Sequence, residues 1–390
     1  MGKKLFEGIR TVEVTGHVTG PVTTQLLADC GAESIIIETG SRRIGFGGFR
    51  RADDAKNTTG KLSVSINFIN PKGLELARRV IASADVFVEN MAGGTLARRG
   101  LGYEDIRKIK PDIIYLATCM QGQTGPHAKH AASGHKLSAL AGFNHITGWP
   151  DREPGWVGTY TDFVAPRYNI IAILGALEYR RRTGKGQFLD MSQYEPGLQF
   201  MAPAILDYTV NGRVAGREGN KCSYAAPHNA YHCQGEDRWC AIAVFTDEEW
   251  LRFCKVISKP ALAGNPRFAT LLTRKENEEE LDRLVNEWTG SHTAEEVMSL
   301  MQAAGVAAGL VETVKDQVEN DPQLKARQFF WELESPEPKK YLTSPPPYYR
   351  LAIRVRQGPL LGEGNDYVFK NILGMSDEEI AGLVKEGVIA

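Results

Sequence analysis

The stretch RTVEVTGHVTGPVTTQLLADCGAESIIIE, residues 10 to 38, decides the fold. Its first five residues are rich in β-branched side chains, which is typical of a strand. The segment from residue 20 to residue 33 has Pro21 near its start and Gly31 near its end, as expected of a helix. The run SIIIE, residues 34 to 38, is typical of a buried strand. The stretch therefore predicts a strand, a helix and a second strand.

The same alternation continues along the chain. The next predicted elements are a strand (KLSVSIN, 61–67), a helix (NPKGLELARRVIASAD, 70–85), a strand (VFVEN, 86–90), a short helix (GYEDIRKIKP, 102–111) and a strand (DIIYLAT, 112–118). Asn70 is a plausible cap of its helix, with Pro71 in the first turn. Strands separated by helices predict βαβ units and a mainly parallel sheet.

An apolar helix is predicted later in the chain, from about Phe163 to Arg182. The run TGKGQ ends it, FLDMS (188–192) is a predicted strand, and a further helical stretch covers Gln193 to Asn211. The pattern changes near residue 215, where loop, paired strands and amphipathic helices follow. The sequence therefore predicts a smaller α+β domain after the α/β part.

The composition excludes several classes of function. The chain has 390 residues, 42% of them hydrophobic and 24% charged, and its net charge is −1, so neither nucleic acid nor a membrane surface is an expected partner. The six cysteines are scattered without a C-x-x-C pair, which predicts reduced thiols and a cytoplasmic location. The histidines lack metal-binding spacing, so no metal is expected.

Familiar catalytic motifs are missing. The first turn reads TGHVTGP and lacks the G-x-G-x-x-G of dinucleotide-binding folds, and the chain has neither a G-x-S-x-G elbow nor a phosphate-binding P-loop. Asn90 and Met91 lie at the carboxyl end of a predicted strand, the edge at which parallel sheets bind ligands. Arg98 follows within reach of a phosphate. Arg42 and Arg43 flank a glycine-rich loop that suits either an anionic ligand or solvent.

Asp162 is the only formal charge between Glu153 and Arg167, and it lies at the mouth of the apolar helix. One interpretation is a helix cap, because aspartate is a preferred capping residue. The other is a nucleophile, because the positive helix end would keep the carboxylate ionised and a carboxylate can attack an acyl group. Spacing alone leaves both open.

Asp162 followed by TGKGQ resembles the signature of class III CoA transferases, the family of formyl-CoA transferase and of the carnitine and bile-acid CoA transferases. The TGKGQ run begins twenty-one residues after Asp162. Other blocks agree in order: GPVTTQLLADCGAESIIIE, ADVFVENMAGGTLARRGLGYEDIRKIKPDIIYLA, GQTGP, GEDRWCAIAV, VENDPQLKARQFF and PLLGEGNDYVF. The resemblance covers essentially the whole chain.

The resemblance implies a fold and an assembly. It implies an α/β, Rossmann-like large domain built from both ends of the chain, a smaller α+β domain, and an interlocked, chain-link dimer. The expected boundaries are 1–200 for the N-terminal part of the large domain, 201–224 for a linker, 225–315 for the small domain, 316–345 for a second linker and 346–390 for the C-terminal part that completes the large domain. The dimer would be a homodimer or a heteromer with a paralogous subunit.

The resemblance also implies a reaction. CoA passes from an acyl-CoA donor, such as succinyl-CoA, to a free carboxylic acid. Asp162 would attack the thioester to give a mixed aspartyl anhydride, and exchange would proceed through an aspartyl-CoA thioester. The CoA thioester is a substrate, and no permanently bound cofactor is expected. Residues that match the family's CoA contacts are Val18, Thr19, Ile66, Asn67, Asn90, Met91, Ala92 and Arg98; Arg42, Arg43, His130 and Ser133 are further candidates for phosphate or substrate contacts.

Several positions depart from the family pattern. Leu62 replaces a usual arginine, Thr39 replaces a usual basic residue, and Ser133 with Gly134 replaces a tyrosine–acid pair. The formyl enzyme's glycine-rich flap has no equivalent, which argues against its substrate. The blocks ASGH and AAPHNAYHC are more similar to the branch of benzylsuccinate CoA transferase, which works as two related subunits. One alternative is therefore a subunit that is inactive without its partner. Another is an α-methylacyl-CoA racemase that uses His130 or His135 with Asp162.

Overall fold

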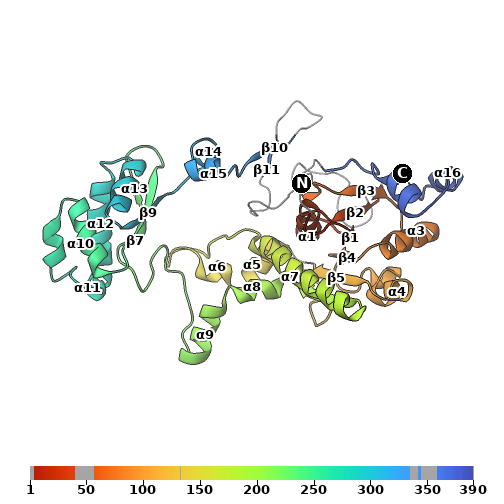
Figure 1. The fold of residues 1–390 in the computed structure, drawn as a ribbon. Helices are drawn as coiled ribbons and strands as arrows, with labels where there is room; N and C mark the ends of the chain where they lie inside the picture. The colour runs from red at the N-terminus through yellow and green to blue at the C-terminus, as the bar shows by residue number, and fades with distance from the viewer. Residues whose placement is uncertain (1–3, 40–56, 132, 334–340, 344–357, 390) are drawn as a thin grey trace. The chain divides into compact units, whose positions relative to one another are not determined.

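The computed structural model describes residues 4–39, 57–131, 133–333, 341–343 and 358–389 (Figure 1). The chain forms two compact units. Unit 1 comprises Met1–Asn144, Trp156–Ala215 and Lys325–Ala390, and unit 2 comprises His145–Gly155 and Gly216–Leu324. Both units are therefore built from segments that lie far apart in the sequence. None of the described helices combines the length and the apolar character that crossing a membrane requires.

Unit 1 contains a six-stranded sheet. Its strands are β1 (Arg10–Val14), β2 (Glu33–Glu38), β3 (Leu62–Ser65), β4 (Val86–Glu89), β5 (Ile114–Cys119) and β6 (Gln187–Ser192). They lie in the order β3-β2-β1-β4-β5-β6, and every neighbouring pair is parallel. The predicted α/β fold with a parallel sheet is thereby confirmed. The strand order reverses between β1 and β4, and ligands of such sheets bind beyond the carboxyl ends of the strands at this point.

The first βαβ unit follows directly from its sequence. Helix α1 covers Thr19–Asp29, with Pro21 in the first turn, where a missing N–H costs nothing. Gly31 has φ +107° just after the helix, a conformation that side-chain-bearing residues avoid. Val12 of β1 then pairs with Ile35 of β2 in parallel register. The turn chemistry thus sets where the helix ends and the second strand begins.

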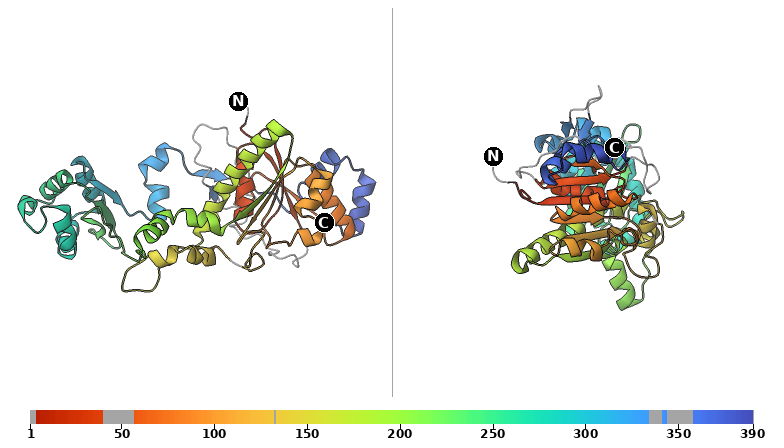
Figure 2. Two further views of the ribbon diagram at one scale, coloured as in Figure 1. Left: turned by 90° about the horizontal axis from the view of Figure 1, so that it is seen from below. Right: turned by 90° about the vertical axis from the view of Figure 1, so that its right-hand side faces the viewer.

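Helices cover both faces of the sheet (Figure 2). On one face, α3 (Pro71–Ala82), α4 (Tyr103–Ile109) and α16 (Asp377–Lys385) pack over a core that includes Val12, Val80 and Phe87. On the other face, α1 and α7 (Tyr160–Thr183) enclose a core that includes Leu27 and Ile173. The Asn70 side chain caps α3 by accepting the Lys72 N–H at 2.9 Å, as the sequence predicted.

The C-terminal segment completes the first of these two cores. Val368 and Phe369, in a π-helical turn (Tyr367–Ile372), and Val388 are fully or almost fully buried in it. The Asn67 N–H donates to the Val388 carbonyl at 2.8 Å, which joins the end of the chain to the loop after β3. The two ends of the chain therefore share one core.

The helical stretch predicted from Gln193 to Asn211 is interrupted. It consists of α8 (Tyr194–Gln199) and α9 (Ala202–Asn211), with Pro203 in the first turn of α9. A proline has no N–H to continue the preceding helix, but it suits the start of a new one. No residue of α9 is buried in this chain. Three further short helices are α5 (Gly134–Leu140), α6 (Phe143–Ile146) and α15 (Pro322–Ala326).

Unit 2 is an α+β structure. Its antiparallel sheet has the order β7-β8-β9, with strands His228–His232, Trp239–Ala243 and Ala307–Leu310. Helices α10 (Asp247–Val256), α11 (Leu271–Glu276), α12 (Glu278–Thr289), α13 (Ala294–Ala303) and α14 (Val314–Glu319) belong to this unit. Its separate core is built around Trp250 and Phe253. Thr246 and Glu249 form a capping box at the start of α10. The short strands β10 (Trp331–Leu333) and β11 (Tyr341–Thr343) belong to unit 1.

Candidate active site

Asp162 lies in the first turn of α7, but it is not the helix cap. The helix begins at Tyr160, three residues before the predicted start, and Thr159 occupies the capping position. The reason is local: Gly158 adopts φ +74° and turns the chain into the helix early, and the Asp162 N–H already donates to the Thr159 carbonyl at 2.9 Å. Of the two interpretations that spacing left open, the structure therefore does not support the helix cap, although Asp162 does lie near the positive end of the helix.

The buried face of α7 fixes the position of Asp162. Asp162, Ala165, Asn169, Ile173 and Ala176 recur at helical spacing and are all buried. Within this row, the Asn169 amide donates to the Thr23 hydroxyl of α1 at 2.9 Å and to the Thr118 hydroxyl of β5 at 3.0 Å. The start of α7 is thereby tied to the carboxyl edge of the parallel sheet.

Two residues contact the Asp162 carboxylate closely. The Gln193 amide nitrogen donates to Oδ1 of Asp162. Gly134, the first residue of α5, leaves no room for a side chain, because a methyl group there would lie 2.6 Å from Cγ and 2.7 Å from Oδ1 of Asp162. The carboxylate thus lies between an amide donor and a backbone surface without side chain.

Burial governs the charge of Asp162. The residue is 8% exposed, and desolvation raises its pKa above the ordinary value of 3.8. The hydrogen bond from Gln193, the nearby charges of His135 and His17, and a hydrogen bond with Thr159 act in the opposite direction without cancelling the effect of burial. Burial therefore sets the direction in which the pKa of Asp162 is shifted.

His135 and Trp156 extend this group. Their rings lie 4.6 Å apart between centroids, and Trp156 is 73% exposed. The Nδ1 atom of His135 is buried and has no hydrogen-bond partner among the residues that the structure describes. Trp156, Gln193 and the contact through Gly134 were missed at the sequence level. The one available signal was the polar Gln193 directly after the strand FLDMS.

Asn90 links two of the predicted CoA-binding segments. Its side-chain oxygen accepts the Gly16 N–H at 2.9 Å, and its amide nitrogen donates to the Gly16 carbonyl at 2.7 Å. The loop after β1, which leads to Val18 and Thr19, is thereby held against the loop after β4, which contains Met91 and Ala92. These predicted contacts do come together at the switch point of the sheet. The side-chain oxygen and nitrogen of Asn90 are both hydrogen-bonded to the backbone of Gly16.

The remaining predicted contacts are more dispersed. Ile66 is fully buried in the core, so only its backbone could face a ligand, and Asn67 follows it after β3. Arg98 is exposed in a short 3₁₀ helix (Ala97–Arg99), where it donates to the Gly93 carbonyl at 3.3 Å and to Thr95 at 3.2 Å.

The further candidates for phosphate or substrate contacts are either exposed or lie outside the described residues. Ser133 precedes α5, and His130 pairs with His127 through their Nδ1 atoms at 3.1 Å. Both Ser133 and His130 are exposed. Arg42 and Arg43 lie outside the described residues.

A second buried carboxylate at this edge was not predicted. Glu89, the last residue of β4, accepts the Met91 N–H at 2.7 Å and the Gln123 amide at 3.1 Å. Burial raises its pKa to about 8. Gln123 in turn donates its N–H to Asp190 and accepts the Gly94 N–H, both at 2.9 Å. Glu89 therefore supports the loops beside the predicted CoA contacts.

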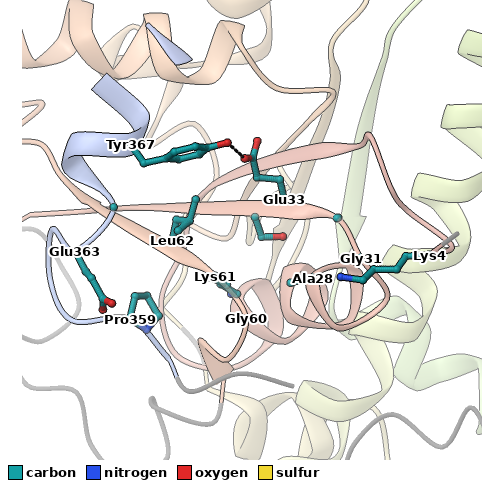
Figure 3. A pocket seen from close by; sticks show the side chains of 13 residues that line it. Lys4, Ala28, Gly31, Glu33, Gly60, Lys61, Leu62, Pro359, Glu363 and Tyr367 are labelled. Atoms are coloured by element: carbon teal, nitrogen blue, oxygen red, sulfur yellow. Dashed lines mark hydrogen bonds between the residues drawn. The ribbon is translucent and has the colours of Figure 1, made fainter. Parts of the chain in front are cut away.

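The cavity in Figure 3 lies elsewhere. It has a volume of about 420 Å³ and is lined in part by Glu33 and Leu62, the first residues of β2 and β3, and hence by the amino edge of the sheet. Tyr367 donates to Glu33 at 2.7 Å across it. None of the predicted site residues that the structure describes lines this cavity. Among the described residues, no three His, Cys, Asp or Glu side chains gather in a way that could hold a metal ion.

Comparisons with known proteins agree with the arrangement. The model of CoA-transferase family III matches residues 6–365. The chain is 32% identical over 399 residues to succinyl-CoA–D-citramalate CoA-transferase of Chloroflexus aurantiacus, covering 98% of each chain. It is 29% identical to the beta subunit of succinyl-CoA–L-malate CoA-transferase of the same organism, covering 98% of this chain and 97% of that one. The crystal structure of a CAIB/BAIF family protein from Brucella suis matches with a TM-score of 0.85 and 30% identity, covering 95% of this chain and all of that one.

Proposed function

The chain belongs to CoA-transferase family III, and from this premise we propose that it moves CoA from succinyl-CoA to a small dicarboxylic acid, with Asp162 as nucleophile. The observation that carries the proposal is the buried Asp162 carboxylate at the carboxyl edge of the sheet. Relatives named for transfer from succinyl-CoA to D-citramalate and to L-malate support the donor and suggest a hydroxylated dicarboxylate as acceptor.

The proposed route exchanges one thioester for another. An oxygen of Asp162 attacks the thioester carbonyl of succinyl-CoA, and CoA thiolate leaves, which gives a mixed aspartyl anhydride. The thiolate then attacks Cγ of Asp162 and releases succinate, which leaves an aspartyl-CoA thioester. The acceptor carboxylate attacks that thioester, and the released thiolate finally attacks the acceptor's carbonyl. Asp162 is regenerated as a carboxylate.

The surroundings of Asp162 suit this chemistry. Anhydrides and thioesters react with water, so a site that excludes water prevents their loss. Burial also raises the pKa of Asp162, which makes its carboxylate more basic and a better nucleophile once it is ionised. The CoA substrate would lie over the linked loops of Val18, Thr19 and Asn90 to Ala92, with Arg98 toward a phosphate. No permanently bound cofactor enters this route.

The test combines a variant with isotope labelling. Asp162→Ala should abolish transfer while the circular dichroism spectrum and the melting temperature stay close to those of the parent protein. Turnover with an acceptor acid labelled with ¹⁸O in its carboxylate should place label in the peptide that contains Asp162. Unchanged turnover of the variant, or an unlabelled peptide after many turnovers, would refute Asp162 as nucleophile.

The proposal includes an interlocked dimer with a Rossmann-like large domain that is built from both ends of the chain. Helix α9 supports a partner, because Leu206, Tyr208 and Val210 are 62%, 59% and 77% exposed in this chain. Apolar side chains gathered on one exposed helix mark interaction surfaces. Light scattering of the purified chain should give the mass of a dimer, and Leu206→Glu should shift the mass toward the monomer.

The partner is a second copy or a paralogous subunit. The L-malate relative, named as a beta subunit, supports the heteromer. Transfer by the purified chain alone would exclude the subunit that is inactive without its paralogue. The proposed location is cytoplasmic, on the support of six cysteines that are all free.

His135 favours one further candidate, an α-methylacyl-CoA racemase. Its Nδ1 is unpaired among the described residues, and its charge acts on Asp162, so the two could hold opposite faces of an acidic α-carbon. In this case an α-methylacyl-CoA would exchange its α-proton with D₂O when no acceptor acid is present. Absence of exchange together with active CoA transfer would eliminate the racemase.

A further inference from the structure

Gln193 is held rigidly at the carboxyl edge of the sheet. It directly follows β6, and its N–H donates to the Cys119 carbonyl at 2.8 Å, which extends the pairing of β5 with β6 by one residue. The next N–H, of Tyr194, donates to the Met120 carbonyl at 3.1 Å. The side chain is only 1% exposed. Its amide therefore points at Asp162 from a fixed backbone.

The two oxygens of Asp162 have different surroundings. Oδ1 accepts the hydrogen bond from the Gln193 amide. Oδ2 is the atom nearest to the place that a side chain of Gly134 would occupy. Gly134 has no such side chain, so Oδ1 is bound to the Gln193 amide while Oδ2 packs against the backbone of Gly134. The carboxylate is thus oriented before any substrate arrives.

We propose that Gln193 is a catalytic residue that donates a hydrogen bond to the oxyanion formed on Oδ1 whenever Cγ of Asp162 is attacked. The assignment rests on the proposed function, in which Asp162 carries the acyl group. Oδ2 makes the bond to the succinyl carbonyl, and Oδ1 then remains as the carbonyl oxygen of the aspartyl group. Gln193 already contacts that oxygen in the resting protein.

In two steps of the proposed route, the negative charge of the tetrahedral intermediate forms on Oδ1. When CoA thiolate attacks Cγ of the anhydride, the C=O electron pair moves to Oδ1. Collapse of this intermediate breaks the bond between Cγ and the bridging oxygen Oδ2, and succinate leaves with Oδ2 as one of its carboxylate oxygens. When the acceptor carboxylate attacks Cγ of the thioester, the pair again moves to Oδ1, and collapse expels CoA thiolate. A fixed donor at this atom stabilises both tetrahedral intermediates.

The first and last steps of the route need no such help from Gln193. There the attacked carbon belongs to the donor or acceptor acid, and the oxyanion forms on that acid's own oxygen. The proposal therefore separates two isotope exchanges. Labelled CoA enters succinyl-CoA through the first step and its reversal alone, whereas labelled succinate enters succinyl-CoA only if Cγ of Asp162 is also attacked.

The experiment measures both exchanges in Gln193→Met, which keeps the length of the side chain and removes the donor. Exchange of ¹³C-succinate should fall about 10²- to 10³-fold, the scale of losing one oxyanion donor. Exchange of deuterated CoA should stay within about threefold of the parent rate. Gln193→Asn, whose amide is one methylene short, provides a second variant. Gln199→Met, at an exposed position of α8, is the matched control and should leave both rates unchanged.

Each outcome decides between the two proposals. Equal slowing of both exchanges in folded Gln193 variants, or slowing of neither, overturns the role of Gln193. Asp162→Asn should lose both exchanges, and retention of either in that variant would instead refute Asp162 as nucleophile. Melting temperatures within a few degrees of the parent show that the Gln193 variants are folded.

Discussion

Two of the carboxylates that unit 1 buries, those of Glu13 and Asp162, have very different surroundings. Glu13 is fully buried and forms an ion pair with Lys61, which is equally buried. Its other oxygen accepts hydrogen bonds from the hydroxyls of Thr15 and Thr24, both at 2.7 Å. Asp162 has one amide donor and no cation in hydrogen-bond contact among the described residues. Glu13 thus has an ion-pair partner and two hydroxyl donors, whereas the proposed nucleophile Asp162 has no charged partner in hydrogen-bond contact among the described residues.

The same isosteric change at the two carboxylates should give the largest and most divergent effects. Asp162→Asn should lower transfer about 10⁴-fold or more, the scale of removing a nucleophile. Glu13→Gln should instead destabilise the protein by about 3–5 kcal/mol, because it leaves the Lys61 ammonium buried without its counter-charge. Steady-state kinetics and urea unfolding separate the two results.

The control for this comparison is Glu386→Gln. Glu386 pairs with Lys72 where both side chains are largely exposed, so its loss should cost at most about 1 kcal/mol. The contrast would fail if folded Glu13→Gln protein lost its turnover, or if its stability matched that of Glu386→Gln.

Gly134→Ala tests whether the close packing of Gly134 against the Asp162 carboxylate matters for turnover. The added methyl group would lie 2.6 Å from Cγ of Asp162, so the carboxylate must move. We expect kcat to fall about 10- to 100-fold, because displacements of about 1 Å at a reacting group cost this much. Gly175→Ala on α7, where a methyl group meets no atom within 4 Å, is the matched control. Equal kcat for the two variants would contradict close packing at Gly134.

A smaller effect should appear in the stability of Asp162→Asn. The folded-state pKa of Asp162 is raised above its unfolded value, so ionised Asp162 destabilises the fold as pH rises through the folded pKa. At pH 8 the amide variant should therefore melt a few degrees above the parent protein, and the difference should shrink at acidic pH. Thermal unfolding across this pH range tests the sign, and a lower melting temperature at pH 8 would contradict it.

The pH dependence of transfer should follow the same group. Only ionised Asp162 attacks, so kcat/KM should fall as pH decreases, with its midpoint above the 3.8 of an ordinary aspartate. Gln193→Met removes a hydrogen bond that lowers this pKa, so the midpoint should move to higher pH in that variant. A midpoint at or below 3.8 in the parent protein would show that burial does not govern Asp162.

Local sequence patterns predicted the elements better than the contacts between them. The strand RTVEV coincides with β1, and Asn70 caps α3 as its spacing indicated. The start of α7 was missed because Gly158 turns the chain earlier than the apolar pattern suggested. Spacing alone could not decide whether Asp162 was a cap or a nucleophile. That choice depended on the resemblance to a family.

The contacts of the site could not be predicted because they join distant segments. Gln193 contacts Asp162 because β6 pairs with β5, and the sequence of neither strand specifies that pairing. Asn90 was expected to face CoA, yet its amide is bound to Gly16, which lies 74 residues earlier in the chain. Such hydrogen bonds follow from strand order, so they become visible only when the whole sheet is assembled.

The shared core of the two chain ends has a consequence for biosynthesis. Val12, Val368 and Val388 share one core, so unit 1 can close only after the ribosome has translated residue 388. At typical elongation rates, synthesis of the whole chain takes roughly 20–80 s, and apolar strands of the nascent sheet wait for much of that time. Unit 2 has its own core and ends at Leu324, so it can mature first. Truncation after residue 360 should therefore lower the yield of folded, soluble protein, and any loss of activity should follow from that loss of folded protein.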